Sequence, residues 1–296
     1  MRRNNRQIDV TWTVKYITEF IGTALLVILG NGAVANVELK GTKGYKSGWG
    51  IITLGYGFGV MLPALMFGNV SGNHINPAFT LGLAISDLFP WKQVLPYILA
   101  QMLGAIFGQL IIVATHAPYY RQTESSDGIL GTFSTISAVD DGTDASKKAS
   151  LINGFLNEFA GSFVLFFGAL ALTKNYFGGE IVQQLNTMGT DVTSSTFKFS
   201  QVGLTVGANV NSGLAIAHLG LGFLVMALVA SLGGPTGPAL NPARDLGPRL
   251  LHHFLPESVL GKSKGNSKWW YSWVPVIAPI LAGIAGVALF KYLYMK

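Results

Sequence analysis

Cysteine is absent from this chain of 296 residues, and charged residues are scarce, at 11% of the total. The missing cysteine excludes disulfide-stapled domains, thiolate metal sites and thiol nucleophiles. A soluble globular chain carries roughly 25% charged residues, so the few present here do not suffice to cover a water-facing surface. The chain has instead 50% hydrophobic residues and 37 glycines. Because glycine is more frequent in transmembrane helices than in soluble ones, the composition indicates an integral membrane protein with several spans.

The net charge of +6 does not indicate a nucleic-acid-binding surface. Lys and Arg are scattered singly, apart from the pairs Arg2-Arg3 and Lys147-Lys148, whereas a nucleic-acid site needs a basic cluster on one face. The charge does not orient the chain either, because Lys and Arg are divided evenly between the two sides if the N-terminus is inside.

Six apolar runs of about 20 residues are long enough to cross a bilayer as helices. They cover residues 12–36, 49–70, 92–116, 151–173, 213–233 and 268–293. Two further apolar runs, 76–86 and 241–253, are too short to cross. At about 1.5 Å per residue, a helix of that length reaches only about halfway through the ~30 Å hydrocarbon core. Each short helix must therefore enter from one side and stop.

Two connections are long and polar, residues 117–150 and 174–212. Both are predicted to be surface loops. The second is long enough to form a gate or a docking segment, although a loop without a specific role is an equally good interpretation.

Two motifs occur once in each half of the chain. A Glu-Phe-x-Gly motif begins at Glu19 in the first span and at Glu158 in the fourth, and an Asn-Pro-Ala motif opens each short run. The two copies of the latter are Asn76-Pro77-Ala78 and Asn241-Pro242-Ala243. Each half, 12–116 and 151–293, holds three crossings, and because three is odd the second half enters from the opposite face. We expect one membrane channel domain over residues 1–296, an inverted repeat whose two short helices meet near the midplane.

The start of each short helix has the same capping chemistry. An Asn at the N-cap accepts from backbone N–H groups of the first turn, and a Pro in the next position gives up a donor that would have no partner anyway. A single Asn-Pro-Ala is a common turn sequence, but two copies at matching places in a repeat are specific.

The duplicated motifs and the string from Asn241 to Pro248 resemble the aquaporin (major intrinsic protein) family. Asp245, directly after Arg244, resembles the aquaglyceroporin (glycerol facilitator) branch of that family. The resemblance covers about residues 12–293. It implies an all-α membrane fold with six tilted helices, two re-entrant half-helices and a pore in each monomer of a homotetramer. It also implies a multi-pass protein of the cell (plasma) membrane with both termini in the cytoplasm.

A pore for neutral solutes has to replace the hydrogen bonds of water without stabilising an ion. The amides of Asn76 and Asn241 can donate to a passing oxygen, while the positive ends of both half-helix dipoles repel cations at the same point. The loops before the two caps are non-helical, and their carbonyls are tolerated at that depth only where they line a cavity or are buried. We predict a ladder of carbonyl acceptors formed by Gly72, Asn73, His74, Gly237, Pro238 and Ala239.

Arg244 is the strongest single candidate for the filter, because an arginine at membrane depth is costly and normally functional. A structural ion pair with Asp245 is the alternative, but neighbouring residues on a helix diverge, so we expect Asp245 to face away. The family pattern implies three further filter positions, which are occupied here by Tyr56, Val229 and Pro238.

Two of these filter positions depart from the family pattern. Glycerol facilitators commonly carry Trp where this chain has Tyr56 and Phe where it has Pro238. The loss of one ring predicts a wider and less apolar constriction. Candidate solutes besides glycerol and some water are undissociated lactic acid, urea and hydrogen peroxide.

Glu19 and Glu158 lie inside spans, where a free carboxylate would cost several kcal/mol. A proton relay is one interpretation. Similarity to the family favours another, in which each Glu accepts N–H groups from its re-entrant loop and anchors the half-helix.

The preferred function is therefore a passive channel for glycerol and other small neutral solutes that excludes ions and protons. An ion- or proton-coupled secondary transporter is the alternative, because transporters also use inverted repeats and midplane half-helices. An intramembrane enzyme is disfavoured, since the sequence contains neither Gly-x-Ser-x-Gly nor His-Glu-x-x-His. We expect no catalytic residues, cofactor or metal site.

Overall fold

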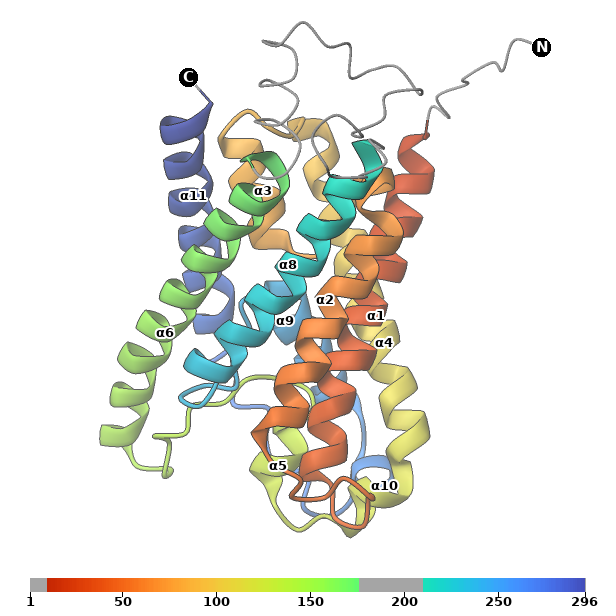
Figure 1. Cartoon of the computed structure of the whole chain (residues 1–296). Coiled ribbons are helices and arrows are strands. Elements are labelled where there is room, and N and C mark those ends of the chain that lie inside the picture. Colours follow the sequence, from red (N-terminus) through yellow and green to blue (C-terminus); the bar gives the residue numbers. More distant parts are fainter. Residues whose placement is uncertain (1–9, 176–209, 296) are drawn as a thin grey trace, which may run out of the picture.

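The computed structural model describes residues 10–175 and 210–295, and nearly all of the regular structure in this part of the chain is helical (Figure 1). The elements are α1 (Trp12–Glu38), α2 (Trp49–Ser71), α3 (Pro77–Ile85), η1 (Trp91–Gln93), α4 (Val94–Gln122), α5 (Ser126–Gly131), α6 (Asp144–Leu170), η2 (Ala171–Asn175), α8 (Val210–Leu232), α9 (Pro242–Phe254), α10 (Glu257–Leu260) and α11 (Val274–Tyr294). Six of them, α1, α2, α4, α6, α8 and α11, are long and apolar enough to cross a membrane. The six predicted spans are thus confirmed.

The boundaries differ from the predicted ones where polar caps and turns extend or shorten a helix. The hydroxyl of Thr143 accepts from the N–H of Ser146, so α6 begins at Asp144, seven residues before the apolar run. The sixth spanning helix, α11, begins only at Val274, because residues 269–273 form turns. Most of the predicted loop at 174–212 lies outside the described residues.

The two halves of the chain interlock. The start of α1 and the end of α11 lie at one end of the bundle, and α5 and α10 lie at the other (Figure 1). The short helix α3 of the first half packs against α11 of the second half, and α9 of the second half packs against α4 of the first. Each half-helix is therefore held mainly by the long helices around the centre of the molecule, including one from the opposite half.

Glycines allow these helices to approach closely. A Cβ atom on Gly104 of α4 would lie 2.3 Å from the carbonyl oxygen of Phe20 on α1. A Cβ atom on Gly283 of α11 would lie 2.6 Å from the carbonyl oxygen of Ala78 on α3. Such close approaches of helix backbones at small residues are the usual means of packing helices in a membrane, where no hydrophobic driving force brings helices together.

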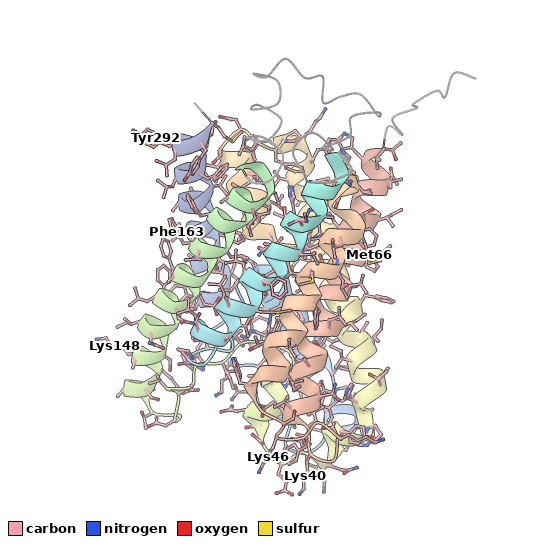
Figure 2. All side chains as sticks on the ribbon, viewed as in Figure 1. Lys40, Lys46, Met66, Lys148, Phe163 and Tyr292 are labelled. Atoms are coloured by element: carbon pink, nitrogen blue, oxygen red, sulfur yellow. The ribbon has the colours of Figure 1, made fainter. Side chains whose placement is uncertain are left out.

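The outer surface of the bundle is apolar along its middle. Figure 2 shows Met66 and Phe163 projecting outward there, whereas the labelled residues Lys40, Lys46 and Tyr292 lie near the two ends. Met66 is 58% exposed. In a soluble protein such a belt would be an aggregation hazard; in a bilayer it is the lipid-facing surface.

We predict that Gly104→Ala and Gly283→Ala each destabilise the protein by about 1–3 kcal/mol, because the added methyl group meets a backbone oxygen that cannot move alone. The measurement is thermal unfolding in detergent. Gly50→Ala is the matched control on α2, since no atom lies within 4 Å of its added Cβ. Equal stability of all three variants would contradict the close packing described here.

Candidate functional site

The two half-helices begin with the predicted caps. The side-chain oxygen of Asn76 accepts from the backbone N–H of Ala78, with N and O 3.0 Å apart. The side-chain oxygen of Asn241 accepts from the N–H of Ala243 at the same distance, 3.0 Å. A proline follows each Asn as the first helical residue. The oxygen of each amide is thus used within its own half-helix.

The nitrogen of each amide crosses to the other half. Asn76 Nδ2 donates to the carbonyl oxygen of Leu240 at 2.7 Å, and Asn241 Nδ2 donates to that of Ile75 at 2.7 Å. Ile75 and Leu240, which immediately precede the caps, have φ values of 43° and 49°, a backbone conformation that is uncommon for non-glycine residues. Sequence reasoning missed these two carbonyls, which join the tips of the half-helices to each other.

The two buried carboxylates hold these loops in place. Glu19 accepts from the backbone N–H groups of His74 (2.9 Å) and Ile75 (2.7 Å). Glu158 accepts from those of Ala239 (2.9 Å) and Leu240 (2.8 Å). Both side chains are fully buried, and each carboxylate also accepts a side-chain hydroxyl from its own half of the chain. These are the contacts that an anchoring role requires.

Two cavities meet at Tyr56 and Arg244. The first, of about 80 Å³, follows the half-helix tips, and the second, of about 290 Å³, opens beyond them. Tyr56 and Arg244 line both cavities, so these two residues lie at the junction. The predicted filter residues Val229 and Pro238 line the first cavity.

The walls of the first cavity are chemically unequal. Polar groups come from the re-entrant loops and caps, namely Asn73, His74, Asn76, Ala239 and Asn241. The remaining lining is largely apolar. Apart from Ile75 and Leu240 of the loops, its apolar side chains come mainly from the long helices and α3, among them Leu26, Val60, Phe79, Leu165, Phe166, Ala169, Leu221 and Val225. A solute with hydroxyls on one side and carbons on the other matches this division.

The predicted carbonyl ladder divides between the two cavities. Gly237 lines the second cavity, whereas Asn73, His74, Pro238 and Ala239 line the first. Gly72 lines neither of these two cavities. It ends α2 as a left-handed C-cap with φ 85°, and its N–H donates to the carbonyl of Gly68.

Arg244 is buried and oriented by two acceptors. Its Nη2 donates to the hydroxyl of Tyr56, and its Nη1 lies 3.5 Å from the carbonyl oxygen of Phe133. The guanidinium carbon lies 4.9 Å from the centre of the Tyr56 ring, within the range of a cation–π contact. Its Nε has no partner. Because Nε is also buried, the donors that remain for the junction of the cavities are the second N–H groups of Nη1 and Nη2.

Asp245 faces away from Arg244, as expected from the helix geometry. It forms a fully buried ion pair with Arg249, in which Nε and Oδ1 are 2.9 Å apart. The carboxylate also accepts from the N–H and the hydroxyl of Thr135, each at 2.7 Å. Arg249 in turn donates to the carbonyl oxygens of Thr135 and Ser267. This network fastens the segment around Thr135 to α9.

The prediction that residues 117–150 form only a surface loop is wrong. The segment contains the end of α4, the short helix α5 and the first residues of α6, and residues 132–135 are buried. The reason is that Asp245, Arg249 and Arg244 are buried charges that need partners, and the backbone of this segment supplies them. The alternation of polar and apolar residues in the segment gave no sign of this burial.

Sequence reasoning also missed two buried amides, Asn31 on α1 and Gln109 on α4. Asn31 accepts from the hydroxyl of Tyr56 at 2.7 Å, and its Nδ2 lies 2.9 Å from Gln109 Oε1. Their signal was present in the sequence, since a polar residue in the middle of a transmembrane span is normally functional.

Lys268 joins Asp127, which lines the second cavity, to Asp140. Its ammonium group lies 2.8 Å from a carboxylate oxygen of Asp127 and 2.8 Å from one of Asp140. Burial lowers the pKa of Lys268, but its hydrogen bonds and ion pairs with both carboxylates outweigh that effect and raise the pKa above its ordinary value. Among the described residues, no group of three or more His, Asp or Glu side chains is placed to hold a metal ion.

We predict that Arg249→Met destabilises the protein by about 3–5 kcal/mol, because it leaves the Asp245 carboxylate buried without its partner. Unfolding in detergent, followed by temperature or denaturant, measures the effect. Lys147→Met is the matched control, since Lys147 pairs with Asp144 at the exposed start of α6, where ion pairs contribute less than about 1 kcal/mol. Equal losses in the two variants would refute the structural importance of the buried pair.

Comparison with known proteins supports the fold and extends to most of the chain. The model of the major intrinsic protein family matches residues 7–185 and 192–290. The glycerol facilitator-aquaporin gla of Lactococcus lactis subsp. cremoris is 61% identical over 97% of this chain and 100% of its own length. The glycerol uptake facilitator protein-like 5 of Lactiplantibacillus plantarum is 43% identical over 96% of this chain and 98% of its own length.

A solved structure is similar as well. The X-ray structure of the aquaglyceroporin from Plasmodium falciparum matches with a TM-score of 0.67 at 26% identity, over 96% of this chain and 97% of that one. These similarities confirm the predicted all-α membrane fold and group the chain with transport proteins rather than enzymes. The chain belongs to the major intrinsic protein family.

Proposed function

We propose that this protein is a passive channel for glycerol and other small neutral solutes, with some water, in the cell membrane. The observation that carries the proposal is the pair of cavities that meet at Tyr56 and Arg244, next to the joined tips of the half-helices. The names of the Lactococcus and Lactiplantibacillus relatives support glycerol as a solute.

In this proposal a solute exchanges its water for fixed groups on one wall. Arg244 donates to its oxygens, the loop carbonyls accept from its hydroxyls, and the second N–H of each capping Asn donates near the midplane. Its carbons slide along the apolar wall. Cations and hydronium are excluded because Arg244 carries a permanent charge and both half-helix dipoles are positive at the tips.

The filter of the proposed channel consists of Tyr56, Val229, Pro238 and Arg244. Tyr56 is the one aromatic residue among these four, so the filter is wide enough to admit solutes somewhat bulkier or more polar than glycerol. Undissociated lactic acid, urea and hydrogen peroxide are the candidates. The charge of Arg244 does not by itself exclude an anion, but the largely apolar opposite wall offers a lactate ion no compensation for its lost hydration.

The proposed assembly is a homotetramer in which each chain, residues 1–296, is a single channel domain. Both termini are assigned to the cytoplasm. The second cavity, at the end of the bundle away from the termini, then opens to the outside.

The alternative is a secondary transporter coupled to ions or protons. The carboxylates argue against a transporter. Both oxygens of Glu19 and of Glu158 accept hydrogen bonds from backbone N–H groups of the loops, and such a carboxylate is poorly placed to bind and release a proton in each transport cycle.

We predict that proteoliposomes show a glycerol influx that rises linearly with the gradient and far exceeds that of empty liposomes. Stopped-flow light scattering measures it. Arg244→Ala is expected to raise proton and cation leakage by roughly tenfold to a thousandfold, because a unit charge about 4 Å away contributes up to about 4 kcal/mol to the barrier. Lys147→Met is the control. Saturable influx that accumulates solute against its gradient would favour the transporter.

We further predict that Tyr56→Trp lowers lactic acid permeability more than glycerol permeability, because the larger ring narrows the filter. The test follows internal pH in proteoliposomes supplied with lactic acid at pH 4 and at pH 7. Passage at pH 4 only indicates the neutral acid. Equal rates of lactic acid entry in Tyr56→Trp and in the unmodified protein would refute the wide filter as the cause of this selectivity.

A further inference from the structure

We propose that Asn31 is a positioning residue of the filter, which fixes the direction of the Tyr56 hydroxyl and thereby the orientation of Arg244. This inference rests on the proposed function, because it assigns a determinant of selectivity to a channel.

Asn31 determines which way the Tyr56 hydroxyl points. The hydroxyl donates its single proton to Asn31 Oδ1 at 2.7 Å, and its oxygen accepts from Nη2 of Arg244, which has donors only. A tyrosine hydroxyl otherwise donates or accepts as its surroundings demand. With its proton committed to α1, Tyr56 contributes no donor to the filter.

Asn31 is itself fixed by two acceptors. Its Nδ2 donates to Oε1 of Gln109 at 2.9 Å and to the carbonyl oxygen of Phe133 at 3.1 Å. Both amide side chains are fully buried. The carbonyl oxygen of Phe133 can only accept, so it orients the amide with its nitrogen toward Phe133 and its oxygen toward Tyr56.

The carbonyl oxygen of Phe133 closes the network into a ring. It accepts from Asn31 and also lies 3.5 Å from Nη1 of Arg244. The ring runs from Asn31 to Tyr56, to Arg244, to the Phe133 carbonyl and back, and it joins α1, α2, α9 and the segment before α6. Closed hydrogen-bond networks are cooperative, so removing one member weakens the others.

The ring determines which donors meet a solute. Arg244 has five N–H donors; one is directed to Tyr56 and one to Phe133, and Nε is buried, which leaves the second N–H of each Nη for the cavity. The guanidinium plane is held by bonds on two of its nitrogens. Asn31 does not line either of the two cavities that meet there, and it therefore acts on selectivity only through Tyr56 and Arg244.

The experiment is a double-mutant cycle read as the ratio of glycerol to water permeability in proteoliposomes. The variants are Asn31→Leu, Tyr56→Phe and their combination. Each single substitution opens the ring, and we expect each to lower the ratio by roughly fivefold, as the loss of about 1 kcal/mol from one hydrogen bond implies. The combined variant is expected to lower it no further, because the ring is already open.

Asn36→Leu is the matched control on the same helix. Its amide donates to the carbonyl oxygen of Gly32 on its own helix, and its ratio should equal that of the unmodified protein. If Asn31→Leu does not fold, Asn31→Ala replaces it in the cycle, with thermal unfolding measured for every variant.

Two results would overturn the positioning role: an unchanged ratio in the Asn31 variant, or losses that multiply in the combined variant. Multiplying losses are what a merely structural contribution of Asn31 would produce. Failure of the proposed function is seen separately, as a glycerol permeability of the unmodified protein no higher than that of empty liposomes. In that case the double-mutant cycle uses water permeability alone, and the effect of the combined variant is again compared with the effects of the two single substitutions.

Discussion

The structure depends on a reciprocal pair of hydrogen bonds between two half-helix tips. Asn76 donates to Leu240 and Asn241 donates to Ile75, so neither tip can take its position without the other. A carbonyl left without a donor in the hydrocarbon core costs several kcal/mol. The left-handed backbone at Ile75 and Leu240 is a further cost. Both costs are offset only when the two halves are folded around each other.

The anchors and the close helix contacts serve this arrangement. Glu19 and Glu158 satisfy the N–H groups of the same loops whose carbonyls meet the opposite Asn. Glycine contacts bring the long helices near enough to hold the half-helices in place. In the proposed channel, the groups that join the halves are therefore also the groups that a solute meets, which links the stability of the fold to passage through it.

The sequence predicts the parts of this structure that depend on length and repetition. Span lengths and the odd number of crossings per half suffice for the inverted repeat, and the duplicated Asn-Pro-Ala identifies both caps. The filter positions Val229 and Pro238 came from the family pattern and not from any local signal. The Phe133 carbonyl was out of reach, because backbone groups carry no sequence signal and its partner Asn31 is 102 residues away in the chain.

The most direct test of the central claim uses the absence of native cysteine. Single-cysteine variants Trp91→Cys, just after α3, and Phe254→Cys, at the end of α9, place exposed thiols beyond the outer ends of the two half-helices. A membrane-impermeant maleimide is applied to intact cells and to inside-out vesicles. Two half-helices that enter from opposite faces require that one thiol react only in cells and the other only in inverted vesicles. Reaction of both thiols from the same face would contradict the account.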